Sequence, residues 1–284
     1  MNLKILIAKT AGFCFGVERA VDMAFSHGNE PATYTYGPII HNEVVTDQLQ
    51  QQGIFVIDDL EEVKADKVEK LIIRSHGVSP DVYEEARAHH VEIVDATCPY
   101  VKKIHRYVEK YDKLGYHILV AGNSAHPEIQ GINGWAQGKC FIAKDVEALK
   151  EVELPEGHYL FVAQTTYKRE VVEEMQAYLK EKGIAFEYIN TICNATKERQ
   201  EEAVSLAKQV DCMLVLGSPS SANTKKLYEI SEANCKKSYC IAGAQGLEEE
   251  MFAGCETVGI TAGASTPQSV IEEVIEWINH FEER

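Results

Sequence analysis

The sequence lacks a hydrophobic run long enough to cross a bilayer. Its longest apolar stretches, such as HILVAG and CMLVLG, are far shorter than the roughly 20 residues that a membrane helix needs. The N-terminal run MNLKILIAKT is interrupted by Lys9, which argues against a secretory signal, and it lacks the arginine-rich composition of a transit peptide. We therefore expect a cytoplasmic protein with no membrane partner.

Positive charge is also scarce. The chain has 28 basic and 44 acidic residues, which gives a net charge of −16. Most of such a surface repels nucleic acid and anionic lipid, so neither is expected as a partner, and any anionic ligand needs a local site. No P-loop is present and no GxGxxG follows a predicted strand, so the sequence offers no nicotinamide or flavin site of that kind.

The eight cysteines include no CxxC pair, which excludes the spacing of zinc ribbons and bacterial ferredoxins. A cytosolic chain keeps its thiols reduced, so a disulfide framework is not expected either. Metal binding, catalysis and simple burial remain as explanations for these cysteines.

A repeated pattern is present instead. Strand-like runs alternate with helical spacing throughout, which predicts parallel sheets with helical crossovers. Three cysteines each begin a helical pattern, and 23 or 24 residues later a β-like run ends in glycine: these are Cys14, Cys98 and Cys193, followed by Gly37, Gly122 and Gly217. The agreement in spacing predicts three structural repeats.

Two polar loops recur in each repeat. The first, GPIIHN, GNSAHPE or GSPSSAN, places His41, His126 or Ser221 four residues after the glycine. The second follows a later apolar strand, in LIIRSHGVSP, YLFVAQTTYK and VGITAGASTP. Helices follow these loops, and Pro80, Pro127 and Pro267 suit a first helical turn, where the missing N–H costs nothing.

We predict three α/β domains at residues 14–96, 97–192 and 193–284. The third lacks its final strand, and the N-terminal segment 1–13 can supply it through residues 3–8. Ligands bind beyond the carboxyl ends of strands in parallel α/β sheets, where these loops lie. The predicted fold therefore has three similar, mainly parallel α/β domains with pseudo-threefold symmetry around a central cavity.

The three equivalent cysteines are candidate metal ligands. The positive end of a helix dipole stabilises thiolate, which is the form that binds metal. A single cysteine is more often a small buried hydrophobe, but threefold repetition favours ligands. Three thiolates suggest an iron–sulfur cluster with one open iron, or a zinc site with a bound water. The cysteines without counterparts are expected in the core: Cys140, Cys212, Cys235, Cys240 and Cys255.

The six loops offer imidazoles, hydroxyls and an amide, a set that suits a phosphate or diphosphate at helix N-termini. These candidates are His41, His76, His126, Thr165, Thr166, Ser221, Asn223 and Ser265. Ordinary capping and turn roles are the alternative for each. Glu128 is the one acid in the set, and beside a metal it would act as a proton donor rather than as a simple helix cap.

Taken in order, the motifs AGFCFGVERAV, GPIIHN, RSHG, DATCPYV, NSAHPE, QTT, NTICNAT, GSPSSANT and TAGAS resemble the LytB-type family of 4-hydroxy-3-methylbut-2-enyl diphosphate reductases. This family provides the terminal enzyme of the non-mevalonate pathway of isoprenoid biosynthesis. The resemblance covers nearly the whole chain. Ala222 is a departure, since the family usually has a second serine there and so one more hydroxyl for the diphosphate.

The resemblance implies an oxidoreductase that converts an allylic diphosphate to isopentenyl diphosphate and dimethylallyl diphosphate by reductive dehydration. Cys14, Cys98 and Cys193 would hold a 4Fe-4S cluster whose open iron binds the substrate hydroxyl, and two electrons would pass singly from a ferredoxin or flavodoxin. Glu128 with Thr165, beside His126, would deliver the proton. The diphosphate would be bound by His41, His76, His126, Thr165, Thr166, Ser221, Asn223 and Ser265.

Two other functions fit the residues. A zinc enzyme could hydrolyse or dehydrate a phosphorylated substrate with a zinc-bound water, and a non-catalytic sensor could report iron or oxygen status. Glu128 with Thr165 is superfluous in a sensor, and catalytic zinc with three thiolates and no histidine is unusual. The reductase is therefore the favoured hypothesis.

Overall fold

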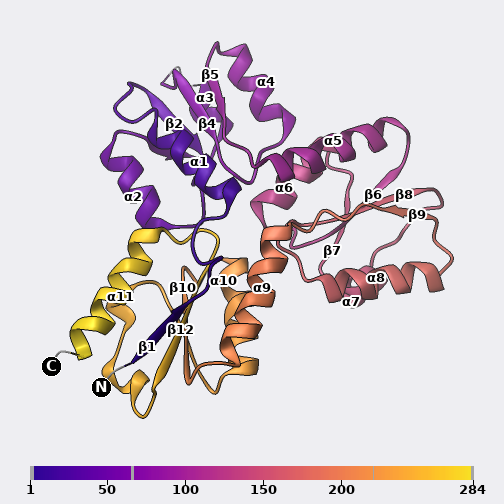
Figure 1. The fold of residues 1–284 in the computed structure, drawn as a ribbon. Helices are drawn as coiled ribbons and strands as arrows, with labels where there is room; N and C mark the ends of the chain where they lie inside the picture. The colour runs from indigo at the N-terminus through magenta and orange to yellow at the C-terminus, as the bar shows by residue number, and fades with distance from the viewer. Residues whose placement is uncertain (1–2, 65–66, 220, 283–284) are drawn as a thin grey trace. The chain divides into compact units, whose positions relative to one another are not determined.

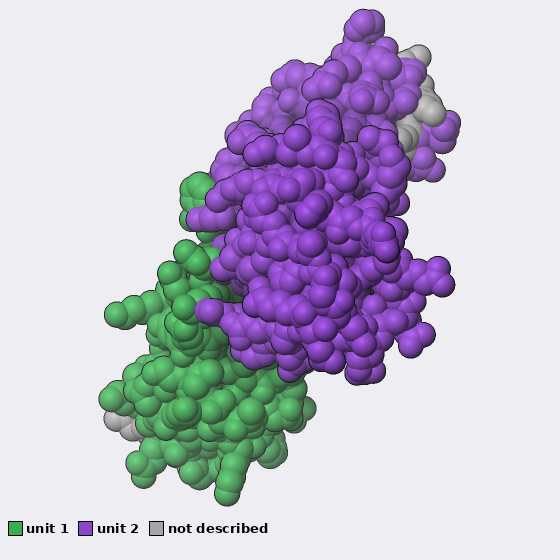
Figure 2. Space-filling view, turned by 90° about the vertical axis from the view of Figure 1, so that its right-hand side faces the viewer, with its two compact units in different colours: residues 1–18, 40–48, 194–284 green, residues 19–39, 49–193 purple. Residues whose placement is uncertain are grey.

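The computed structural model describes residues 3–64, 67–219 and 221–282. Within these ranges the strands form three four-stranded sheets, and every strand pairing is parallel (Figure 1). The chain forms two compact units, coloured separately in Figure 2: Met1–Glu18, Ile40–Gln48 and Asn194–Arg284 make unit 1, and Arg19–Ile39 and Leu49–Cys193 make unit 2.

Unit 2 contains two of the sheets. The first has the order β3-β2-β4-β5 and is made of β2 (Thr33–Tyr36), β3 (Phe55–Ile57), β4 (Lys70–Ile73) and β5 (Glu92–Asp95). The second has the order β7-β6-β8-β9 and is made of β6 (His117–Ala121), β7 (Phe141–Ala143), β8 (Tyr159–Ala163) and β9 (Phe186–Tyr188).

Unit 1 contains the third sheet. Its order is β1-β12-β10-β11, made of β1 (Lys4–Ile7), β10 (Cys212–Leu216), β11 (Lys237–Ile241) and β12 (Thr257–Ala262). The N-terminal strand β1 thus pairs with β12, from Lys4 opposite Thr257 to Ile7 opposite Ile260. It takes the position that β5 and β9 hold in the other sheets, as expected from the missing last strand of the third repeat.

The helices recur in the same order. The cysteines precede α1 (Phe15–Phe25), α5 (Pro99–Lys113) and α9 (Asn194–Ala207); the first polar loops precede α2 (Glu43–Gln51), α6 (Pro127–Trp135) and α10 (Ala222–Asn234). The second polar loops precede α4 (Pro80–Ala88), α8 (Arg169–Glu181) and α11 (Gln268–Glu282). Short helical segments complete the pattern: the α-helices α3 (Leu60–Lys64) and α7 (Val146–Lys150), and the 3-10 helices Ala244–Gly246 and Glu249–Phe252.

Burial on both faces explains the continuous apolar strands. In β6, Ile118 and Val120 pack on one face with Ile104 of α5, whereas Leu119 packs on the other face with Val172 of α8. Successive side chains alternate between faces, so a strand covered on both sides must be apolar throughout. The prediction of an α/β fold with three similar parallel sheets is therefore confirmed.

Details differ from the prediction. Pro80 and Pro127 are the first residues of α4 and α6, but Pro267 lies one residue before α11, which begins at Gln268. The predicted domain boundaries at 14–96, 97–192 and 193–284, and the pseudo-threefold axis, stay predictions. Across the described residues, no helix is both long and apolar enough to cross a membrane.

Candidate functional site

The three candidate cysteines occupy the same place in the backbone. Each lies directly before a helix, and Cys98 is the N-cap of α5. The backbone N–H of each donates to a carbonyl in the second polar loop of its own unit: Cys14 to Ala264 (3.4 Å), Cys98 to Ser75 (2.9 Å) and Cys193 to Thr165 (2.8 Å). Each acceptor is the second residue after its strand, β12, β4 or β8. The repeat predicted from the sequence therefore recurs in the backbone hydrogen bonds of the three cysteines.

The next residue in each of these loops is a predicted substrate ligand. Ser265 follows Ala264, His76 follows Ser75, and Thr166 follows Thr165. One backbone hydrogen bond therefore joins each cysteine to the residue that precedes a predicted substrate ligand.

The three candidate cysteines are less buried than three of the five other cysteines. None of the eight forms a disulfide; Cys14, Cys98 and Cys193 are half-buried, whereas Cys212, Cys235 and Cys255 are buried. Burial raises the pKa of Cys140 and of Cys212 to about 12, which keeps both protonated near neutral pH. Cys140 is partly buried and packs against the core cluster of the second sheet, as expected, whereas Cys240 is only partly buried.

Glu128 is held by one partner residue. Its side chain is 2% exposed, and Thr165 donates to it twice, from the backbone N–H to Oε1 and from Oγ1 to Oε2, both at 2.7 Å. Burial raises the pKa of Glu128 to about 7, although both hydrogen bonds from Thr165 act to lower it. A carboxyl group with this pKa can donate a proton near neutral pH.

His126 connects this carboxyl group to the first polar loop. It is the N-cap of α6, and its Nδ1 accepts a hydrogen bond from the Glu128 N–H at 3.1 Å. Nδ1 therefore carries no proton, and the tautomer assigned from this bond keeps the proton on Nε2. The His76 ring lies edge-on to the His126 ring, with centroids 5.3 Å apart. In unit 2 the fold thus brings together His76, His126, Glu128 and Thr165.

Gln164 links the two polar loops of this sheet, and the sequence reasoning did not single it out. Its Oε1 accepts from the Asn123 N–H, and its Nε2 donates to the Thr166 hydroxyl, both at 3.3 Å. The side chain is buried, so it fixes Thr166 relative to the loop that carries His126.

Unit 1 holds the other predicted ligands. Ser221 is the N-cap of α10, and its Oγ accepts from the Thr224 N–H at 3.4 Å. Asn223 and Ser265 are 6% and 8% exposed, yet the Asn223 amide and the Ser265 hydroxyl have no hydrogen-bond partner among the described residues. Buried polar groups rarely stay unpaired, so these atoms fit a polar ligand.

His41 occupies a slightly different position from His126 and Ser221. In its loop the cap is the next residue, Asn42, whose Oδ1 accepts from the Val45 N–H at 3.2 Å. The Asn42 Nδ2 donates to the Ser265 carbonyl at 2.9 Å, which fixes this loop to the second polar loop of unit 1.

Two charged residues of α9 hold the segment before Cys14. The Arg199 guanidinium is 3% exposed and donates from Nη1 to the carbonyls of Gly12 (2.9 Å) and Ala262 (2.7 Å). One turn later, the Glu202 carboxylate accepts from the N–H groups of Lys9 (2.8 Å) and Thr10 (2.9 Å) and from the Thr10 hydroxyl (2.6 Å). This arrangement, the α9 clamp, fixes the backbone that leads to Cys14.

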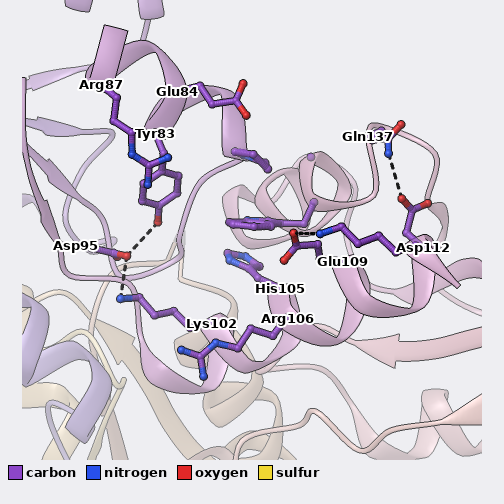
Figure 3. Close-up of a pocket in the computed structure, with 14 residues that line it drawn as sticks. Tyr83, Glu84, Arg87, Asp95, Lys102, His105, Arg106, Glu109, Asp112 and Gln137 are labelled. Atoms are coloured by element: carbon purple, nitrogen blue, oxygen red, sulfur yellow. Dashed lines mark hydrogen bonds and ion pairs between the residues drawn. The ribbon is translucent and has the colours of Figure 1, made fainter. Parts of the chain in front are cut away.

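Asp95 plays a similar part before Cys98. Its Oδ1 accepts from the Thr97 N–H at 3.0 Å, while its Oδ2 accepts from the Tyr83 hydroxyl at 3.2 Å and pairs with Lys102 at 2.8 Å (Figure 3). Burial alone would raise the pKa of Asp95, but the hydrogen bonds from Lys102 and Thr97 bring it below its ordinary value. The ionised carboxylate holds the turn that presents Cys98.

Comparisons with known proteins show which family the chain resembles. Residues 5–279 match the LytB protein family. The chain is 47% identical over 279 residues to the 4-hydroxy-3-methylbut-2-enyl diphosphate reductase of Caldanaerobacter subterraneus subsp. tengcongensis, covering 97% of this chain and 96% of that one. It is 42% identical to the enzyme of the same name from Alkaliphilus oremlandii, over 98% and 100% of the two chains.

Solved structures show the same relationship. One, described as (E)-4-hydroxy-3-methyl-but-2-enyl diphosphate reductase, the terminal enzyme of the non-mevalonate pathway, is 38% identical with a TM-score of 0.73, over 98% of this chain and 99% of that one. The E-1-hydroxy-2-methyl-but-2-enyl-4-diphosphate reductase from Plasmodium falciparum is 29% identical with a TM-score of 0.88, over 99% and 88%. This chain belongs to the LytB protein family.

Proposed function

We propose that this chain, in the cytoplasm, converts 4-hydroxy-3-methylbut-2-enyl diphosphate to isopentenyl diphosphate and dimethylallyl diphosphate. The names of its relatives support this reaction. The observation that carries the proposal is the hydrogen bond repeated at all three cysteines, which joins each thiol-bearing residue to a loop with a predicted substrate ligand.

Cys14, Cys98 and Cys193 would hold a 4Fe-4S cluster with one iron free of cysteine. Half-buried thiols at helix starts, none of them in a disulfide, suit this role, because they remain accessible to an incoming cluster. When bound, such a cluster supplies electrons one at a time and a Lewis-acidic iron.

The diphosphate would be bound by hydroxyl, amide and imidazole groups rather than by lysine or arginine. The buried, unpaired groups of Asn223 and Ser265 support this assignment in unit 1, and the N-cap positions of His126 and Ser221 support it at two helix N-termini. The remaining proposed ligands are His41, His76, Thr165 and Thr166.

Glu128 would donate the proton that lets the substrate hydroxyl leave as water. Its pKa of about 7 leaves a large fraction protonated under physiological conditions, and the two hydrogen bonds from Thr165 fix the carboxyl group in one orientation. The overall change consumes the substrate, two electrons and two protons, and yields one product molecule and water. A separate one-electron donor, such as a ferredoxin or flavodoxin, would supply the electrons.

The test is to purify the protein without oxygen and measure its visible absorbance, iron, sulfide and zinc. Substrate and excess dithionite are then added, and the two products are quantified. We expect a brown protein with about four irons and four sulfides per chain, as the proposed 4Fe-4S cluster requires, that forms both products. A colourless zinc protein would contradict the cluster, and a brown protein that leaves the substrate unchanged would indicate a sensor.

A further inference from the structure

Helix α5 is basic in an acidic protein. Its 15 residues carry Lys102, Lys103, Arg106, Lys110 and Lys113 against two acids, Glu109 and Asp112. Five minus two gives a net charge of +3, so the rest of the chain carries −16 − 3 = −19. Helix α5 therefore carries a net positive charge in a chain that is otherwise strongly acidic.

The exposed cations of α5 share one side of the helix. At roughly 100° per residue, Lys103, Arg106, Lys110 and Lys113 fall within an arc of about 80°. Val101, Ile104 and Val108 point the other way and are buried. All four cationic side chains on this arc are exposed to solvent.

Most of these cations have no anionic partner. Lys113 pairs with Glu109 at 2.6 Å, but Lys103, Arg106 and Lys110 form no ion pair with any described residue. Figure 3 shows the contrast with Lys102, which is turned toward Asp95, whereas Arg106 is drawn without such a bond. The helix dipole favours Lys110 and Lys113 in the last turn, but it does not explain Lys103 and Arg106.

Exposed apolar groups accompany the charges. Tyr100 and Leu114, at the two ends of the helix, are 48% and 62% exposed and are among the few large apolar side chains that face solvent in the described chain. Arg106, Lys110, Lys113 and Leu114, with Glu109, line a hollow of about 360 Å³. Tyrosine and arginine beside an apolar group are typical of protein interfaces.

The cationic side of α5 begins near Cys98, a proposed cluster ligand. Cys98 is the N-cap of α5, and Lys103 lies five residues further along, a rise of about 7.5 Å. A protein seated on the N-terminal half of the helix would therefore lie close to Cys98, and a short distance favours electron transfer.

We propose that the α5 face, defined as Tyr100, Lys103, Arg106, Lys110, Lys113 and Leu114, docks an acidic protein that carries a one-electron redox centre. This proposal rests on the proposed function and identifies where its electron donor binds. An acidic partner is repelled by the remaining surface and attracted to this face, which orients the encounter. Each encounter oxidises the carrier by one electron, and two encounters with two protons complete one turnover.

The test uses two charge-matched variants of the holoprotein. Lys103→Glu/Lys110→Glu reverses two charges on the face. Lys180→Glu/Lys182→Glu makes the same change on the exposed end of α8, where Lys182 lies over the Tyr178 ring at 5.6 Å, much as Lys103 and Lys110 lie over Tyr107 and Tyr111. The probe is an acidic 2Fe-2S ferredoxin, and the readouts are its calorimetric affinity and its stopped-flow rate of electron transfer.

At low salt we expect the α5 variant to lose about tenfold or more in affinity and rate, whereas the α8 variant changes less than about twofold. The difference between the two variants should shrink in 0.5 M salt, where the Debye length is only about 4 Å. Equal losses in both variants, or no loss in either, would overturn the docking face. It would also be overturned if the α5 variant lost binding to a DNA probe while its binding to ferredoxin stayed unchanged. Dithionite does not need docking, so failure of dithionite-driven turnover in all proteins would instead contradict the proposed function.

Discussion

Replacing Glu128 by Gln tests the buried carboxyl group directly. The pKa of Glu128 rises from its ordinary value of 4.5 to about 7, because the group is buried. Between these two pH values the native protein keeps a proton that the unfolded chain loses, so the wild-type free energy of unfolding must fall as the pH rises. A shift of about 2.5 units corresponds to about 3 kcal/mol. Glutamine has nearly the same shape as glutamate but has no carboxyl group to titrate.

The measurement is urea unfolding of the wild type and the Glu128→Gln variant at pH 4.5 and pH 8. Relative to the wild type, the variant should gain up to about 3 kcal/mol of stability between the two pH values. Glu174→Gln, at an exposed position on α8, serves as a control with the same chemical change and should leave the wild-type pH profile unaltered. Parallel profiles for wild type and Glu128→Gln would refute the raised pKa.

The same substitution tests the proton donor. Turnover with dithionite should fall about 10²–10⁴-fold, the usual contribution of a positioned general acid. Iron content and visible absorbance should stay at the wild-type level, since Glu128 is not a proposed ligand. Undiminished turnover in a fully loaded variant would remove Glu128 from the mechanism.

Three further substitutions probe the surroundings of the site. Thr165→Val removes a hydrogen bond that lowers the pKa of Glu128, so the basic limb of the pH–rate profile should move to higher pH; an unchanged limb would contradict this. Arg199→Met should lower the free energy of unfolding by about 2–3 kcal/mol in urea titrations, because two buried carbonyls lose a charged donor, and Lys at this position should restore part of it. Cys98→Ser should reduce iron per chain at least severalfold while Cys212→Ser does not, and equal iron loss would show that buried and half-buried thiols were wrongly separated.

The sequence predicted the sheets because their signal is repeated and strong. The strand before each first polar loop is apolar over four or five residues or built of β-formers, and β6, β8 and β10 are buried on both faces. The missing last strand of the third repeat also had one available substitute, the N-terminal run that forms β1. Spacing could supply both conclusions without knowledge of any side-chain contact.

The supporting contacts could not be predicted in this way. Arg199 lies on the buried stripe of α9, in register with Ala203 and Leu206, and a charge in that position was the available signal. Its partners are backbone carbonyls 187 and 63 residues away, and carbonyls have no sequence signature. Gln164 and Asp95 likewise act through backbone groups of distant or adjacent loops. Repeat spacing identifies residues that recur in each repeat, whereas Arg199, Gln164 and Asp95 each occur in one repeat.

Binding of the diphosphate substrate and docking of the acidic electron donor are predicted to respond to salt in opposite ways. The proposed diphosphate ligands include no lysine or arginine, so short-range hydrogen bonds bind a substrate that the net charge of −16 repels. Screening that repulsion should leave kcat/KM for the substrate constant or raise it when dithionite is in excess. The α5 face attracts its partner by charge, so ferredoxin-driven turnover should fall over the same salt range. If both rates fell together, charge attraction would contribute to substrate binding, and the assignment of substrate binding to short-range hydrogen bonds alone would be wrong.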